Sequence, residues 1–485
     1  MNRRQFLFAS AGSAFAAAKP VKPNVIFVSV DDMNDWIGCL RGYPGVRTPN
    51  IDRLAKRGAL FADTHCASPL CNPSRTALFT GLRPSTSGVY NNETYFRPNL
   101  PDAVTIPQYF KKHGYHVAGA GKVLHHVAGF NPPDQWDEFQ LQEFDDPWYR
   151  RDEWYPWNKK VPAPASVPYN GLKGFQGEFD WGVLPKSEAA YGDMRAIEFG
   201  KAFLERKHDK PFFLCVGLWH PHIPMFSPQR FWDMYPDDKV RLPEIRENDL
   251  DDVPEEGKRM AGFRREEHER IVKEGKWKEA IHAYLAAISF ADRMVGMMLD
   301  ALDASPYAKN TTLVFWSDNG WHLGEKQHWH KSTLWQRATH VPMIWAGQGV
   351  KSAGKTRNQP VNLLDIYPTL VELCGLAPKA DLEGVSIAPL LKDAGRKWRP
   401  TVSTYLQGNH AVISEKWRYI HYKNGGEELY DRKADPNEFT NLAGDPKLAA
   451  VKSELAAFLP KSDAPPKPDW SHFDFDFKTY TYKRK

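Results

Sequence analysis

Residues 68–81 have the sequence Ser-Pro-Leu-Cys-Asn-Pro-Ser-Arg-Thr-Ala-Leu-Phe-Thr-Gly. Pro73 suits the first turn of a helix, because its missing N–H would have no partner there in any case. Gly81 suits the end of a helix. The stretch therefore predicts a helix with Cys71 at its N-terminus, where backbone N–H groups favour an anionic ligand. The alternative is a buried structural cysteine, since free cysteines are among the most buried residues.

The same stretch resembles the sulfatase signature, in which Cys-x-Pro-Ser-Arg is followed by an apolar helix and Thr-Gly. In type I sulfatases a maturation enzyme oxidises this cysteine to formylglycine, and the hydrated aldehyde is the nucleophile. The resemblance implies that Cys71 is the modified residue. It also implies a formylglycine-generating or sulfatase-maturing enzyme as a partner.

Composition restricts the class of protein. The chain has 485 residues, 42% of them hydrophobic and 25% charged, which is ordinary for a globular protein with one large and one small domain. A net charge of +5 fits an anionic substrate but is too small for a nucleic-acid-binding surface, so no nucleic-acid partner is expected. The five cysteines include no Cys-x-x-Cys pair, so disulfides do not define the fold.

The N-terminus resembles an export signal. Arg3 and Arg4 precede a short apolar run through Ala18, which predicts a twin-arginine signal peptide over residues 1–18 and a periplasmic or secreted protein. An N-terminal anchor is the alternative. The run is too short to span a bilayer and no later stretch reaches about 18 apolar residues, so no membrane span is expected.

Four apolar runs after residue 23 predict buried strands: 24–30, 115–120, 211–218 and 311–316. Helical patterns lie between them, notably 48–58 and 281–302. Buried strands that alternate with helices predict an α/β fold with a mostly parallel sheet flanked by helices. Because ligands bind at the carboxyl ends of such strands, we expect a site there.

Polar side chains follow each of these runs. Oxygen donors that suit Ca²⁺ or Mg²⁺ come after the first and last runs: Asp31, Asp32, Asp318 and Asn319. Cations and proton donors suited to a tetrahedral anion come from Arg75, Lys122, His125, His222 and Lys331. Taken singly, the acidic pair is equally explained by a turn or helix cap, and each lysine or histidine by a surface or polar contact.

The sulfatase resemblance extends over nearly the whole mature chain and implies an alkaline-phosphatase-like fold. Its metal ligands match Asp31, Asp32, Asp318 and Asn319, with modified Cys71 completing the set around one Ca²⁺, or Mg²⁺. Its catalytic residues match Cys71, Arg75, Lys122, His125, His222 and Lys331. The resemblance makes His222 the acid for the leaving oxygen and His125 the base that regenerates the aldehyde, roles that the sequence leaves exchangeable.

Several segments are similar to iduronate 2-sulfatase-like members of that family: VDDMNDWIGCL, GKVLH, the PHIP segment and SDNGWHLGEKQHWHK. Asn319 differs from the histidine of the iduronate enzyme. The resemblance implies a sulfate ester on a polysaccharide or glycosaminoglycan sugar, with a terminal 2-O-sulfated uronate as the leading candidate. His220 and Arg337 are candidate partners for a sugar carboxylate. The alternatives are a phosphodiesterase or phosphonate hydrolase of the same superfamily, and a non-catalytic glycan-binding protein if Cys71 is never modified.

The remaining segments complete the predicted organisation. Residues 131–191 are rich in aromatic residues and 236–278 in charges, and both resemble insertions of irregular structure. Short strand-like runs follow residue 400, with a helix near 447–458, which predicts a small antiparallel sheet. We expect a sulfatase catalytic domain over 19–392 and a small C-terminal α+β subdomain over 393–485.

Overall fold

The computed structural model describes residues 22–142, 168–172, 179–263, 265–351 and 353–485. The predicted signal peptide, residues 1–18, lies outside the described residues. So does much of the aromatic-rich insertion, including the stretch 143–167.

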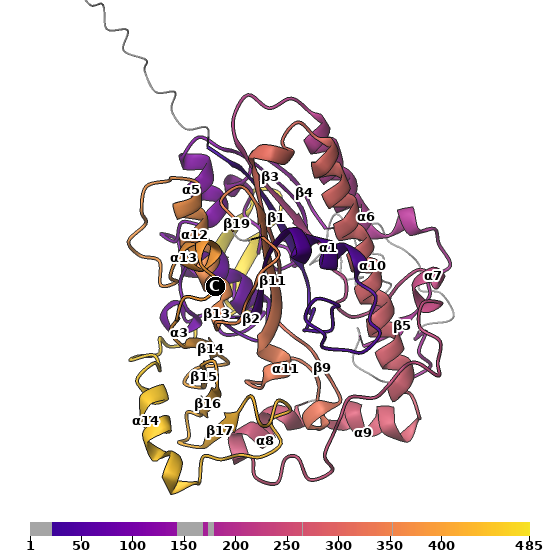
Figure 1. Cartoon of the computed structure of the whole chain (residues 1–485). Helices are drawn as coiled ribbons and strands as arrows, with labels where there is room; N and C mark the ends of the chain where they lie inside the picture. The colour runs from indigo at the N-terminus through magenta and orange to yellow at the C-terminus, as the bar shows by residue number, and fades with distance from the viewer. Residues whose placement is uncertain (1–21, 143–167, 173–178, 264, 352) are drawn as a thin grey trace, which may run out of the picture.

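A nine-stranded sheet forms the centre of the molecule (Figure 1), with the order β12-β2-β11-β8-β1-β6-β3-β4 and β13 beside β2. Its strands are β1 (Asn24–Val30), β2 (Gly58–His65), β3 (His116–Gly121), β4 (Glu138–Gln140), β6 (Phe212–Gly217), β8 (Thr311–Ser317), β11 (His340–Gly347), β12 (Thr356–Arg357) and β13 (Val361–Asn362). The described pairings are parallel except those of β11 with β2 and β8. The predicted mostly parallel sheet is confirmed.

Helices cover both faces of this sheet, which explains why its central strands are apolar throughout. In β1, Ile26 and Val28 face one hydrophobic core, while Val25 and Phe27 face the other. The first core lies under α1 (Pro49–Arg57), α6 (Gly192–Glu205) and α10 (Trp277–Ala304). The second lies under α2 (Cys71–Thr80), α5 (Ile106–Lys112), α12 (Ile366–Leu373) and α13 (Ala388–Lys392).

The C-terminal part forms separate antiparallel sheets. Four strands pair in sequence order: β14 (Thr401–Thr404), β15 (His410–Ile413), β16 (Trp417–His421) and β17 (Glu427–Asp431). Helix α14 (Ala449–Ala456) packs on this sheet, and β18 (Phe473–Asp476) pairs with β19 (Thr481–Arg484) in a final hairpin. The predicted antiparallel sheet is confirmed, whereas the division into domains at residue 392 stays a prediction.

The smaller elements complete the described structure. The short helices are α3 (Pro84–Ser87), α4 (Phe96–Asn99), α7 (Gln229–Trp232) and α11 (Gln336–Thr339). Two further strand pairs are formed by β5 (Trp181–Gly182) with β7 (Met225–Phe226) and by β9 (His322–Leu323) with β10 (Trp329–His330). No helix in the described ranges is long and apolar enough to cross a membrane.

The charged segment 236–278 is more regular than its composition predicts. It contains α8 (Glu255–Gly262) and α9 (Arg265–Lys273). The few apolar residues among the charges hold these helices to the body of the protein: Met260 packs with the C-terminal sheet, and Ile271 joins the core under α10. Most helical stability comes from such packing, which composition does not reveal.

Candidate active site

Four adjacent parallel strands, β8, β1, β6 and β3, deliver polar side chains to one edge of the sheet. The residues that follow these strands are Asp318 and Asn319 after β8, Asp31 and Asp32 after β1, His220 and His222 after β6, and Lys122 and His125 after β3. All of these are buried. The expectation that the strand ends converge is therefore correct.

Helix α2 brings Cys71 to the same place. The helix begins at Cys71 and ends at Gly81, whose φ of 77° places it in the left-handed region, as predicted for these two residues. The Ser74 hydroxyl donates to the main-chain oxygen of Asp318 at 2.6 Å, which holds the first turn of the helix against the end of β8.

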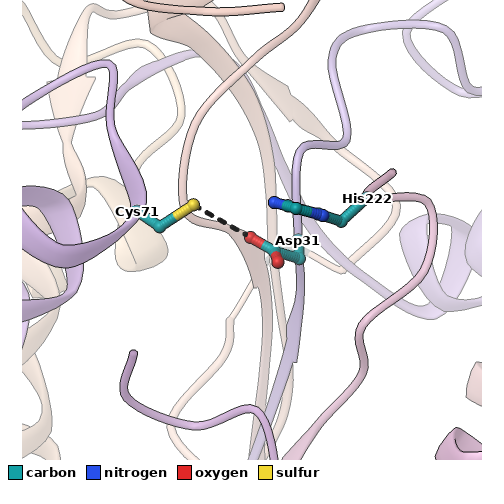
Figure 2. A group of neighbouring side chains, drawn as sticks. All are labelled: Asp31, Cys71 and His222. Atoms are coloured by element: carbon teal, nitrogen blue, oxygen red, sulfur yellow. Dashed lines mark hydrogen bonds between the residues drawn. The ribbon is translucent and has the colours of Figure 1, made fainter. Parts of the chain in front are cut away.

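The Cys71 thiol lies between an anion and a cation. It donates to Asp31 Oδ1 at 3.6 Å (Figure 2). The Lys331 ammonium donates to Cys71 Sγ at 2.8 Å. The His222 ring lies beside Asp31 in the same view. Burial, with the Asp31 charge next, raises the pKa of the Cys71 thiol well above its usual range. The unmodified thiol is therefore a poor nucleophile.

Arg75 connects helix α2 to the ends of three strands, β1, β3 and β8. Its Nε donates to Asp318 Oδ2 at 2.8 Å, and its Nη1 donates to the main-chain oxygens of Lys122 and Val123 at 2.7 and 2.9 Å. Nη2 lies 3.4 Å from Asp31 Oδ1. The guanidinium is fully buried, so these charge-assisted bonds are protected from water. Arg75 thus fixes the mutual position of α2, β1, β3 and β8.

Three carboxylates form a possible metal site. One oxygen each from Asp31, Asp32 and Asp318 lies within 4.8 Å of the others. Asn319 Nδ2 donates to Asp32 Oδ1 at 2.6 Å. Asp32 Oδ2 and Asn319 Oδ1 are buried without a hydrogen-bond partner among the described residues. Oxygen ligands of this kind suit a hard divalent cation, so the residues fit Ca²⁺ or Mg²⁺. A second group that could hold an ion combines Asp31, Cys71 and His222.

The pKa values of Asp31 and Asp32 are shifted in opposite directions. Burial raises the pKa of Asp31, but Lys122, Arg75 and Lys331 outweigh burial and lower it to about 2. For Asp32 burial dominates over the attraction of Lys331 and raises the pKa to about 7. Lys122 is bonded to Asp31, and Lys331 to Asp32. A bound divalent cation would favour the charged form of all three carboxylates.

The two predicted catalytic histidines come from different loops: His222 follows β6, and His125 follows β3. His222 Nε2 is 3.5 Å from Asp32 Oδ2, and its Nδ1 faces the main-chain oxygen of Ile223. His125 Nδ1 is buried without a hydrogen-bond partner in the described part of the chain. Burial, followed by the Lys122 charge, lowers the pKa of both imidazoles well below the usual range, so both are neutral at pH 7.

Sequence reasoning missed two neighbours of these residues, His126 and Trp219. The His126 ring lies 4.5 Å from that of His125 and 4.6 Å from that of Trp219. The Lys122 ammonium lies 4.1 Å from the centre of the Trp219 ring, a cation–π distance. The available signal was adjacency: His126 follows His125 directly, and Trp219 follows β6.

The two candidate partners for a sugar carboxylate are engaged elsewhere. His220 Nδ1 pairs with Asp193 Oδ2 at 2.6 Å, and its Nε2 faces the main-chain oxygen of Phe226 at 2.7 Å. Arg337 pairs with Asp35 and, at 2.9 Å, with Glu325. Both side chains are therefore paired with carboxylates of the protein itself.

The fold is a mostly parallel α/β sheet with helices on both faces, and its strand ends place a possible acidic metal site beside a cysteine at a helix N-terminus. A family model described as Sulfatase matches residues 23–376, and one described as N-sulphoglucosamine sulphohydrolase, C-terminal, matches residues 324–464. The chain belongs to the sulfatase family, and it is a sulfuric ester hydrolase.

Individual relatives agree with this assignment. A "Sulfatase" of Formosa agariphila is 38% identical over 96% of this chain and 91% of its own length. The human "Iduronate 2-sulfatase" is 30% identical over 73% of this chain and 69% of its own. The solved structure of a "2-O GAG sulfatase" has a TM-score of 0.68 at 23% identity, with 92% of this chain and 95% of that chain covered.

Proposed function

We propose that this sulfatase acts through a formylglycine made from Cys71, with one Ca²⁺ beside it, on a sulfated sugar of an acidic polysaccharide. The observation that carries the proposal is the position of Cys71. It is the first residue of α2, its thiol contacts Lys331 and Asp31, and the possible metal site shares Asp31. A formylglycine at position 71 supplies, as its hydrate, a hydroxyl nucleophile for the sulfur atom.

The residues of this chain have complementary tasks in that reaction. Lys122 and Lys331 are ammonium groups at the carboxyl edge of the sheet and offset the charge of the sulfuryl oxygens. Arg75 holds Asp31 and Asp318 in place. His222 gives a proton to the leaving sugar oxygen, and His125 accepts one from the group at position 71. The arrival of an anionic sulfate raises the pKa of both histidines, which allows them to carry protons.

Asp31, Asp32, Asp318 and Asn319 would hold the metal. Bound there, the ion supplies positive charge to the sulfate oxygens and to the nucleophile. Asp32 Oδ2 and Asn319 Oδ1 are the buried oxygens for which an ion would provide the missing partner. We expect metal analysis of the purified protein to find one Ca²⁺ per chain. A content of two zinc ions per chain would contradict this, since the donors are oxygens rather than clustered histidines.

Mass spectrometry of the peptide that contains Cys71 tests the nucleophile. Protein produced together with a formylglycine-generating enzyme is expected to carry the aldehyde and to hydrolyse an aryl sulfate. A fully active protein with an intact thiol would exclude the mechanism. Efficient turnover of a phosphate diester with none of the sulfate would instead support a phosphodiesterase. Unmodified and inactive protein that still binds sulfated glycans would support a binding protein.

A terminal 2-O-sulfated uronate is the proposed substrate. The human iduronate 2-sulfatase and the 2-O GAG sulfatase are the similar proteins that favour it. The assay compares heparin-type disaccharides, algal oligosaccharides and a simple aryl sulfate, and includes carboxyl-reduced sugars as a matched control. Equal cleavage of the reduced and the acidic sugars would exclude recognition of a uronate while leaving the reaction type intact.

Export by the twin-arginine route to the periplasm or beyond is proposed from Arg3 and Arg4. Replacement of both by lysine is expected to retain the protein in the cytoplasm. Unchanged export would indicate another pathway.

A further inference from the structure

The C-terminal hairpin lies beyond the part of the chain that either family model matches. Those matches end at residues 376 and 464, whereas β18 and β19 span Phe473–Asp476 and Thr481–Arg484. An isolated two-stranded hairpin is at best marginally stable in water, so this one depends on what it packs against.

The hairpin packs against the loop that follows His125. Its aromatic side chains surround Tyr95, whose ring centre lies 5.8 Å from that of Phe475 and 5.2 Å from that of Tyr482. The Tyr95 ring in turn contacts the Phe130 ring at a tilt, with 4.9 Å between ring centres, and Phe130 meets His125 edge-on at 4.9 Å. A continuous chain of ring contacts therefore runs from the hairpin to a predicted catalytic histidine.

Two hydrogen bonds reinforce these contacts. The backbone N–H of Asn131 donates to the Tyr480 hydroxyl at 2.7 Å, and the Tyr482 hydroxyl donates to the main-chain oxygen of Gly129. Gly129 has a φ of 90°, and a Cβ there would lie 2.6 Å from the Tyr95 ring, so the loop can take this path only with glycine. The residues between 122 and 131 belong to no helix or strand in the described structure, so contacts with other segments contribute to their position.

The hairpin also lines a cavity beside His125 and His126. A cavity of about 20 Å³, room for about one water molecule, is lined by residues of both the hairpin and the loop. Its lining includes His125, His126, Asn131, Phe477 and Tyr480. The hairpin tip and the loop after His125 thus line the same small cavity.

We propose that the C-terminal hairpin is a positioning element that holds residues 124–131, and with them His125, in the geometry needed for catalysis. The proposal rests on the proposed function, in which His125 moves a proton. Tyr480 and Tyr482 are positioning residues, because they act on His125 through the loop. A misplacement of about 1 Å in a catalytic group can cost on the order of 100-fold in rate.

The test uses the full-length, matured protein with the double substitution Tyr480→Phe and Tyr482→Phe, which keeps the rings and removes both hydroxyls. Tyr109→Phe is the matched control, because the Tyr109 hydroxyl on α5 donates to the main-chain oxygen of Ala377, in the segment that follows α12. We expect kcat for an aryl sulfate to fall roughly 10- to 100-fold in the double variant, with KM little changed. The control should keep its kcat.

A double-mutant cycle with His125→Ala separates positioning from general stability. In a His125→Ala background the two tyrosine substitutions should have little further effect, because the residue that they position is gone. Hydrogen exchange of the amides between 124 and 131 should be faster in the double variant than in the wild type or Tyr109→Phe.

The outcomes are distinct. Unchanged exchange in the loop, or additive effects in the cycle, would overturn the proposal. A wild-type protein that carries formylglycine but hydrolyses no sulfate ester would defeat the proposed function. Loop exchange would still decide whether the hairpin holds the segment, since that measurement needs no activity.

Discussion

At the scale of single residues, the site depends on buried charges that compensate one another. Arg75 bonds to Asp318 and Asp31, Lys331 bonds to Asp32, and all of these side chains are buried. Buried charges are tolerated only when paired, so each partner is needed to keep the others charged. Cys71 sits inside this network, where burial raises its pKa.

Cys71→Ala tests the nucleophile without disturbing the network. We expect sulfatase activity to fall by more than about 10³-fold, the scale seen when a nucleophile is removed. The melting temperature should change little, because the side chain is small. Cys374→Ala is the control, since Cys374 is also a buried free cysteine but lies in the core under α12. Substantial activity in Cys71→Ala would exclude Cys71 as the source of the nucleophile.

Asp35 offers a pH test outside the metal site. Burial raises its pKa, but Arg337 and then His340 outweigh burial and lower it to about 2. A carboxyl group with a lowered folded-state pKa stabilises the fold above its unfolded pKa of about 4, and this contribution is lost as the pH falls toward 2. The shift of nearly two units corresponds to about 2 kcal/mol.

Asp35→Asn should therefore lower the free energy of unfolding by about that amount at pH 7. The difference from the wild type should shrink between pH 4 and pH 3, as urea titrations at several pH values would show. A difference that stays constant over this range would mean that the Asp35–Arg337 ion pair does not contribute as described.

At the scale of elements, α2 shows how a local sequence signal places a functional group. Cys71 is the first helical residue and Gly81 ends the helix with φ of 77°, so the chain turns away at the point where Leu382 packs. A Cβ on Gly81 would lie 2.3 Å from Leu382 Cδ2. The helix end is therefore specified both by backbone conformation and by packing.

Gly81→Ala should lower the free energy of unfolding by about 2 kcal/mol or more, from left-handed strain of order 1 kcal/mol plus the clash. Gly114→Ala is the matched control: its φ is 86° and no other atom lies within 4 Å of the added Cβ. Gly114→Ala should lower the free energy of unfolding only by the contribution of the left-handed backbone strain. Equal losses in the two variants would show that packing against Leu382 does not matter.

At the scale of the whole molecule, the C-terminal sheet forms hydrogen bonds with residues 334–339, which closely follow Lys331. Arg418 of β16 donates to the main-chain oxygen of Leu334 and to the Thr339 hydroxyl, each at 3.0 Å, and pairs with Glu438. Trp335 donates to Glu428 of β17 at 2.7 Å. The segment that carries Lys331, a proposed catalytic residue, thus contacts a sheet formed by residues 401–431.

Arg418→Met should lower the free energy of unfolding by about 3–5 kcal/mol, because it leaves Glu438 as a buried charge without its guanidinium partner. Arg265→Met is the control: its pair with Glu269 is exposed and should contribute less than about 1 kcal/mol. Chemical unfolding monitored by tryptophan fluorescence measures both. A loss of unfolding free energy below 1 kcal/mol in Arg418→Met would show that the contacts of Arg418 contribute little to the stability of the fold.

The sequence by itself determined the features that depend on neighbours along the chain. The apolar runs located β1, β3, β6 and β8, the turn residues located α2, and the polar residues after the strands located most of the site. These signals are local, because a buried strand or a helix end is specified by the residues that form it. The sulfatase signature at Cys71 then indicated the family, which the family match confirms.

Only the tertiary structure decided which of these residues meet. Arg75 and Asp318 are 243 residues apart, and Tyr482 and Gly129 are 353 apart. The same is true of the pair between His220 and Asp193 and of the contact between the His126 and Trp219 rings. Such contacts depend on strand order and on the packing of distant segments, and no local pattern encodes them. For that reason the sequence indicated the proposed catalytic residues, while the contacts that hold them became visible only in the folded chain.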